Sequence, residues 1–195
     1  MTDEERCNMI MRAAEESAQL RLKTAEGLAT AAVDIAERIS GVLGAGGKIL
    51  ICGNGGSAAD SSHMAAEMIV RLTSERNRAA LAAICLNADI SVMTAAANDY
   101  GFDSIYARQV AALGKPGDVL LAISTSGNSA NVVKAAETAR QMNLLVIGLL
   151  GGNGGKLATI CDKKLIIPHK SVQRIQEEHI FYIHLLVELI ESDLF

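Results

Sequence analysis

The chain contains the stretch Lys48-Ile49-Leu50-Ile51-Cys52-Gly53-Asn54-Gly55-Gly56-Ser57, in which an apolar run leads directly into a glycine-rich loop. An alanine-rich segment of helical character follows, so the expected order is strand, loop, helix. Glycines let the backbone approach an anion closely, and the first amides of a helix lack intrahelical partners and carry the positive end of its dipole. The stretch therefore predicts a phosphate site. Taken alone it also fits a plain tight turn, because it matches neither G-x-x-x-x-G-K-[ST] nor G-x-G-x-x-G.

A second strand and loop of the same design lie further along the chain. The apolar run 118–123 leads into Ser124-Thr125-Ser126-Gly127-Asn128-Ser129, and another helical stretch follows. Hydroxyl groups between the carboxyl end of a strand and the amino end of a helix are good donors to phosphate oxygens. Ser129 taken alone is interpreted as a helix N-cap. The two loops together make a phosphorylated small molecule the leading ligand.

Strands and helices alternate along most of the sequence. Strands are predicted at 48–52, 81–85, 118–123, 144–149 and 164–167. Helices are predicted between them at 58–70, 90–97 and 131–142, with a closing helix at 171–191. Two further helices, at 4–24 and 27–43, are expected ahead of the first strand. This order predicts an α/β fold: a doubly wound, flavodoxin-like five-stranded parallel sheet with helices on both faces and an N-terminal helical pair, in the strand order 2-1-3-4-5.

Length and composition fit one globular unit. The 195 residues are 50% hydrophobic, and nothing resembles a linker, so a single domain is expected, with 1–45 as N-terminal helices for oligomerisation and 46–195 as the α/β core with the C-terminal helix. A net charge of -4 argues against nucleic-acid binding as the main function. No apolar run is long enough for a bilayer and the first twenty residues carry charges throughout, so no membrane partner and a cytoplasmic location are expected. The four cysteines lack C-x-x-C spacing and are interpreted as buried reduced thiols.

A polar stripe is expected on the helix after the glycine-rich loop. Asp60, His63, Glu67 and Arg71 are spaced by three, four and four residues and so share one helix face. His63 and Glu67 could both reach one metal ion, or one reacting carbon and its neighbouring oxygen. The alternative is a solvated face with an Asp60–His63 or Glu67–Arg71 surface pair. The position just beyond an anion loop favours a functional role.

The closing helix is strongly apolar but carries two polar candidates. His184 lies within the apolar surface, where a lone histidine is commonly a satisfied core residue, and Gln176 lies two turns earlier. About 12 Å of helical rise separates them, so a shared metal would require their side chains to bend toward each other. His179 is the rival candidate. Because it follows two glutamates, it is expected to be the more exposed histidine.

Five motifs, in this order, resemble those of the sugar isomerase (SIS) domain family, specifically the bacterial phosphoheptose isomerases. They are Cys-Gly-Asn-Gly-Gly-Ser (52–57), His-x-x-x-Glu (63–67), Ala-Asn-Asp-Tyr-Gly-Phe (97–102), Ile-Ser-Thr-Ser-Gly-Asn-Ser (123–129) and Arg-Ile-Gln-Glu-x-His (174–179). The resemblance covers nearly the whole chain. It implies conversion of D-sedoheptulose 7-phosphate to D-glycero-D-manno-heptose 7-phosphate, the first step toward nucleotide-activated heptose for surface polysaccharides such as lipopolysaccharide. It also implies a cytoplasmic homotetramer with active sites at subunit interfaces and one zinc ion per subunit.

The resemblance also implies roles for individual residues. It makes Glu67 and His184 the catalytic pair, and the zinc ligands would be His63, Glu67, Gln176 and His184. Phosphate contacts would come from Ser124, Thr125, Ser126 and Ser129, with Ser57 assisting. The sugar would be contacted by Asn54, Gly55, Gly56, Asn98, Asp99 and Gln176, with Arg71 in a supporting electrostatic role.

The residue types suit an aldose-ketose isomerisation. Moving a carbonyl from C2 to C1 requires removal of a proton beside a carbonyl, an enediol, and return of a proton to the neighbouring carbon. Glu67 is a suitable base and His184 a suitable general acid. Zinc between the two helices could polarise the carbonyl. A carboxylate bound tightly to zinc is a poorer base, so Glu67 could exchange between the two duties.

Two alternatives to the enzyme stay open. One is a non-catalytic tetrameric SIS protein that binds the bacterial replication initiator, which the segments 71–76, 86–89 and 192–195 resemble at least as closely. In that group the positions matching Glu67 and His184 are not glutamate and histidine, so their presence here favours the enzyme. The other alternative is a sugar-phosphate sensor without turnover.

Overall fold

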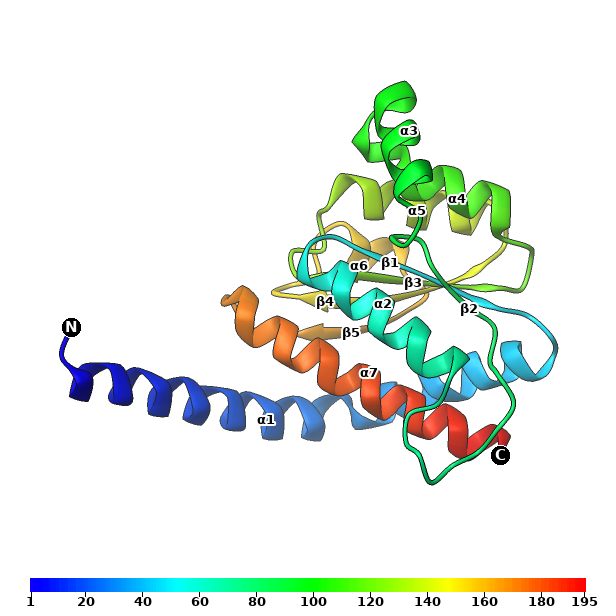
Figure 1. Cartoon of the computed structure of the whole chain (residues 1–195). Coiled ribbons are helices and arrows are strands. Elements are labelled where there is room, and N and C mark those ends of the chain that lie inside the picture. Colours follow the sequence, from blue (N-terminus) through cyan, green and yellow to red (C-terminus); the bar gives the residue numbers. More distant parts are fainter.

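The computed structural model describes residues 1–195 and shows a three-layer α/β architecture with one projecting helix (Figure 1). In chain order the elements are α1 (Asp3–Gly44), β1 (Ile49–Gly53), α2 (Gly56–Ile69), β2 (Ala83–Cys85), α3 (Ile90–Tyr100), the 3₁₀ turn η1 (Phe102–Ser104), α4 (Ile105–Leu113), β3 (Val119–Ser124), α5 (Ala130–Gln141), β4 (Leu145–Gly151), α6 (Leu157–Ile160), β5 (Lys163–Ile167) and α7 (Val172–Leu194). The predicted strands are confirmed with boundaries shifted by one or two residues. The sequence analysis left α4 and α6 unassigned. No helix combines the length and apolarity needed to cross a bilayer.

The sheet has five parallel strands in the order β2-β1-β3-β4-β5, which confirms the predicted fold class and strand order. β1 and β3 are neighbours, with Gly53 opposite Ile123. The two loops singled out from the sequence therefore leave adjacent strands at the same edge of the sheet. Ligands of doubly wound sheets bind at this kind of edge, where the strand order reverses.

Apolar side chains fill a separate layer on each face of the sheet. Alternate residues of β1 point to opposite faces, Ile49 and Ile51 to one and Leu50 and Cys52 to the other. The first layer lies under α1, α2 and α7, and the second lies under α3, α4, α5 and α6. Both faces are thus covered, as expected for a parallel sheet.

The N-terminal segment forms one helix of 42 residues, so the predicted N-terminal helical pair is wrong. The sequence predicts a break between helices at 4–24 and 27–43, near Gly27, but a glycine inside a helix costs only about 1 kcal/mol relative to alanine. Buried positions recur every three or four residues on both sides of it, from Leu20 and Thr24 to Ala32 and Ile35. Packing of this continuous stripe against α7 and β5 outweighs the cost of one glycine.

Most apolar positions in the second half of α1 pack within their own chain. Ala32, Ile35 and Ile39 lie in the core and the partly buried Leu28 packs against it, whereas Val33 is exposed. The amino-terminal half of α1 projects beyond the sheet (Figure 1) and exposes a different set of apolar side chains, Met9, Ile10, Met11 and Leu22.

All four cysteines are free thiols, as expected. Cys52 and Cys161 are buried and Cys85 is half-buried, whereas Cys7 is exposed on the projecting helix, so the prediction of burial is wrong for Cys7. Burial raises the pKa of Cys161 to about 12. Neither buried thiol is a reactive thiolate near neutral pH.

Candidate active site

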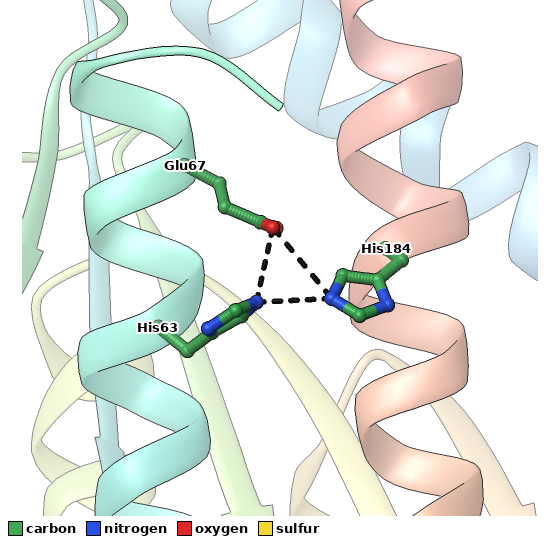
Figure 2. Close-up of side chains that lie close together, drawn as sticks. All are labelled: His63, Glu67 and His184. Carbon is green, nitrogen blue, oxygen red and sulfur yellow. Dashed lines mark hydrogen bonds and ion pairs between the residues drawn. The ribbon is translucent and has the colours of Figure 1, made fainter. Parts of the chain in front are cut away.

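Helices α2 and α7 lie side by side on one face of the sheet and run in the same direction (Figures 1 and 2). The pairs that meet keep this order along both helices: Gly56 with Gln176, then His63 with His184. Each helix therefore presents a polar edge to the other above an apolar base.

Three side chains converge between these helices (Figure 2). His63 Nε2 lies 2.9 Å from His184 Nε2 and 3.0 Å from Glu67 Oε1, and His184 Nε2 lies 3.6 Å from the same oxygen. The i and i+4 spacing on α2 aligns His63 with Glu67, as the sequence predicts. The structure thus brings together three of the four predicted metal ligands.

The donor set fits a zinc ion. Zinc bonds of about 2.0–2.1 Å in a tetrahedron place neighbouring ligand atoms about 3.3 Å apart, and the three separations bracket this value. Two imidazole nitrogens and a carboxylate oxygen are also the ligand types that zinc takes in catalytic sites. The second oxygen of Glu67, Oε2, is buried and has no hydrogen-bond partner.

Gln176 lies near the start of α7, beside the start of α2. Its side-chain amide packs so closely on Gly56 that an added Cβ on the glycine would stand 2.4 Å from Nε2. It makes no hydrogen bond to His63, Glu67 or His184 in the structure, and its place as a fourth ligand stays a prediction.

Neither surface pair of the alternative interpretation forms. His63 pairs with Glu67 instead of Asp60, and the Asp60 carboxylate is partly buried with one oxygen unpartnered. Burial raises the pKa of Asp60 to about 6, an effect that His63 partly opposes. Arg71 lies beyond the end of α2 and donates to the Ser74 carbonyl, so the prediction that it shares the polar helix face is wrong. The helix stops at Ile69, two residues short of the predicted stripe.

The glycine-rich loop is held in place by a buried hydroxyl and a pair of amides. Tyr106 donates to the Gly53 carbonyl at 2.6 Å, and Asn54 and Asn131 exchange two hydrogen bonds of 2.8 Å. The Asn54 side chain therefore joins the glycine-rich loop to the first turn of α5, and the contact of Asn54 with the sugar stays a prediction. Gly55 has a φ of +57° immediately before α2, a conformation that favours glycine.

Asn131 and Tyr106 are site-supporting residues that the sequence analysis missed. Asn131 is almost fully buried in the first turn of α5, and Tyr106 is buried on α4. The only sequence signal was an amide two residues after the hydroxyl-rich loop. Their partners become apparent only once β1 and β3 are placed side by side.

The hydroxyl-rich loop forms a compact cradle. Ser124 Oγ accepts from the Gly127 amide at 3.1 Å and lies 3.1 Å from Ser129 Oγ. Ser129 is the N-cap residue of α5 as predicted, yet its side chain makes no capping hydrogen bond. Ser57 lies in the first turn of α2, directly after the glycine-rich loop that follows β1, and it is buried. Of the two remaining residues with predicted phosphate contacts, Thr125 is half-buried and Ser126 is exposed.

Asn98 and Asp99 lie on α3, on the opposite face of the sheet from α2 and α7. Both are exposed, and the Asn98 amide donates to Asp99 Oδ1 at 2.8 Å. Asp99 lines a separate, mainly apolar cavity of about 650 Å³ beside Cys85 and Tyr100. A single chain does not bring these two residues to the His63, Glu67 and His184 cluster.

The exposure of the two histidines of α7 is the reverse of the prediction. His184 is 46% exposed, whereas His179 is 1% exposed, so the prediction that His179 is the more exposed one is wrong. The face of α7 that carries His179 turns toward the sheet, between the buried Ile175 and Tyr182. Neither ring nitrogen of His179 has a hydrogen-bond partner.

Burial of His179 predicts a loss of stability in mild acid. Burial lowers its pKa from 6.5 to about 4, an effect that the nearby Leu150 carbonyl only partly offsets. Between these values the unfolded chain binds the proton and the folded chain does not, so the free energy of unfolding falls as the pH falls. Between pH 7 and pH 5 we expect a loss of about 2 kcal/mol from this residue.

Urea unfolding of the wild type and of His179→Met across this pH range checks the expectation. The methionine variant lacks the titrating group, so its stability should vary less steeply with pH by that amount. Parallel curves for the two proteins would contradict the assignment.

Comparison with known proteins places these features in a family. Residues 12–151 match the SIS domain. A phosphoheptose isomerase from Methylibium petroleiphilum is 50% identical over 182 residues, which are 92% of this chain and 90% of the relative. One from Helicobacter hepaticus is 56% identical over 148 residues, 76% of this chain and 74% of the relative.

Solved structures of phosphoheptose isomerases have the same fold as this chain. The phosphoheptose isomerase of Neisseria gonorrhoeae superposes with a TM-score of 0.89 at 44% identity, and that of Francisella tularensis with 0.91 at 37%. In each case 98% of this chain and all of the other are covered. The chain belongs to the SIS domain family and, within it, to the phosphoheptose isomerases.

Proposed function

We propose that the protein converts D-sedoheptulose 7-phosphate to D-glycero-D-manno-heptose 7-phosphate through an enediol, with Glu67 as the base. The convergence of Glu67 with His63 and His184 carries this proposal, because it brings a carboxylate and two imidazoles within 3.6 Å of one another. The relatives named phosphoheptose isomerase support the choice of substrate. The same relatives support a place in heptose biosynthesis, as the first step toward nucleotide-activated heptose for polymers such as lipopolysaccharide.

The two loops at the sheet edge suit the substrate phosphate. Ser124, Thr125, Ser126 and Ser129 supply hydroxyl donors, Ser57 adds one from the neighbouring loop, and the first amides of α5 face the same edge. The backbone of Gly55 and Gly56, without side chains in the way, would let the sugar lie close to the loop. Gln176, packed against Gly56, would contact its hydroxyl groups.

Proton transfer falls to Glu67 and His184. The base removes a proton from C1 of the ketose, the electron pair forms the enediol, and a proton returns to C2 as the carbonyl moves to C1. Glu67 has one oxygen, Oε1, near both imidazoles, while its second oxygen, Oε2, is buried and has no hydrogen-bond partner. His184 would donate to and accept from the sugar oxygens.

His63, Glu67, His184 and, as a fourth ligand, Gln176 would hold one zinc ion per subunit. When bound, zinc would polarise the carbonyl and stabilise negative charge on the enediolate oxygens. Arg71, exposed beyond α2, would add positive charge near the mouth of the site.

We further infer a homotetramer whose active sites lie between subunits. Asn98 and Asp99 are predicted to contact the sugar, yet they lie across the sheet from the cluster, so a neighbouring subunit would supply them. The projecting part of α1, within 1–45, exposes apolar residues suited to such assembly, around the single α/β core of 46–195. Because a sugar phosphate does not cross a bilayer, the enzyme is expected in the cytoplasm, where its substrate is made.

Incubation of the purified protein with sedoheptulose 7-phosphate tests the function. We expect an aldoheptose 7-phosphate to accumulate, detected by NMR or by coupling to a heptose 7-phosphate kinase. Absence of turnover by the folded protein, together with binding to the replication initiator, would support the adaptor alternative instead. Absence of turnover with saturable binding of the sugar phosphate alone would support the sensor.

A further inference from the structure

Arg78 lies in the connection between α2 and β2, and its side chain is fully buried. Its guanidinium donates to three backbone carbonyls: those of Glu67 at 2.7 Å, Met68 at 2.8 Å and Ala79 at 2.9 Å. Glu67 and Met68 belong to the last turn of α2, whose carbonyls have no partners within the helix. Arg78 therefore caps the carboxyl end of α2, where a positive charge also complements the helix dipole.

The same guanidinium reaches across to α7. Its Nε lies 2.7 Å from Glu191 Oε1, and Glu191 is 4% exposed. That oxygen also accepts from the Leu72 amide at 3.1 Å, just beyond the end of α2. The Phe195 ring lies near the guanidinium, with its centroid 5.8 Å away. Arg78 and Glu191 thus join the ends of the two helices through charge-assisted hydrogen bonds.

The joined ends lie close to the reactive groups. Glu67 is both the proposed base and the residue whose carbonyl Arg78 holds, and Glu191 follows His184 by two helical turns on the same face of α7. We propose that Arg78 is a positioning residue that, with Glu191, sets the distance between Glu67 and His184. The assignment rests on the proposed function only in taking Glu67 as the base.

A purely stabilising role explains the pair poorly. A buried ion pair contributes little net stability compared with apolar side chains of similar size, because two charges must lose their water. The four hydrogen bonds of Arg78 have a geometric consequence instead, since they fix the last turn of α2 relative to α7. Lysine could not reproduce them, because its donors radiate from one nitrogen and not from a planar fork.

Arg78→Lys in the full-length protein tests the proposal. We expect kcat for sedoheptulose 7-phosphate to fall about 10- to 100-fold, the range typical of residues that orient site ligands, with KM unchanged because the phosphate loops are untouched. Amide hydrogen exchange should become faster in 64–72 but not in β3. Should this variant fail to fold, Glu191→Gln provides the milder test, because it keeps the carbonyl bonds of Arg78 but removes the charge.

Arg21→Lys is the matched control. Arg21 pairs with the buried Glu178 of α7 at 3.1 Å, but it joins α7 to α1 and makes no contact with α2. Its kcat and its exchange in 64–72 should match those of the wild type. Wild-type kcat in Arg78→Lys, or a lower kcat without faster exchange in 64–72, would overturn the proposal. If the wild type itself shows no isomerase activity, the proposed function fails, and exchange in 64–72 alone decides the positioning role.

Discussion

Replacing Glu67 with glutamine is expected to lower kcat by about 10²- to 10⁴-fold, the contribution of a general base, while the fold is retained. The amide has nearly the same shape as the carboxylate and retains an oxygen that can face His63 and His184. It cannot accept the substrate proton. Steady-state kinetics measure the loss, and circular dichroism with a thermal melt checks the fold.

Two further measurements separate the base from the metal ligand. If the wild type carries the proposed zinc, elemental analysis should find it in Glu67→Gln as well, because an oxygen ligand remains, and the loss of kcat would then follow from lost basicity. Glu188→Gln, the same change at an exposed position one turn after His184, is the matched control and should keep wild-type kcat. Full activity in Glu67→Gln would eliminate Glu67 as the base.

Alanine at Gly127 is expected to disrupt the hydroxyl-rich loop. The added Cβ would stand 1.9 Å from the Gly154 carbonyl oxygen and 2.3 Å from its carbon, and φ is +64°. Because both clashes involve backbone, the loop must move away from the 151–155 segment, carrying Ser124 and Ser129 with it. We expect a rise in KM and a loss of about 2–4 kcal/mol in the free energy of unfolding.

Gly46→Ala separates the clash from the backbone strain. Gly46 also has a positive φ, +83°, but no atom lies within 4 Å of the added Cβ, so only about 1 kcal/mol of conformational strain is expected. Urea unfolding and substrate KM of the two variants provide the comparison. A Gly127→Ala protein that equals Gly46→Ala in both would show that the loop tolerates the displacement.

The fold could be predicted from the sequence because local signals agreed with one another. Apolar runs ended in glycine- or hydroxyl-rich loops, and helical segments followed them, so the five-stranded parallel sheet and its order were confirmed. The N-terminal helix was misjudged because the weight of Gly27 depends on packing that a local pattern does not contain. Helix α4 was missed because it follows η1 directly and has no side-chain cap that would mark its start.

The site could be predicted only where its members share a helix. His63 and Glu67 follow from the i and i+4 spacing, and His184 was added by resemblance to a family. Side-chain orientation about α7 was misjudged, because apolar residues surround both His179 and His184 in sequence and only the sheet shows which face is buried. The sequence did not indicate Arg78, Tyr106 or Asn131. Each of them hydrogen-bonds to a backbone carbonyl or a side-chain amide elsewhere in the chain, and a local pattern does not show such a partner.

The most direct test of the central claim is the fate of the proton that Glu67 is proposed to move. Sedoheptulose 7-phosphate is incubated with the purified protein in D₂O and followed by NMR. Proton abstraction through an enediol predicts an aldoheptose 7-phosphate that carries solvent deuterium at C2, and its formation about 10²- to 10⁴-fold more slowly with Glu67→Gln. A ketose that remains unchanged and unlabelled beside the folded wild-type protein would contradict the account.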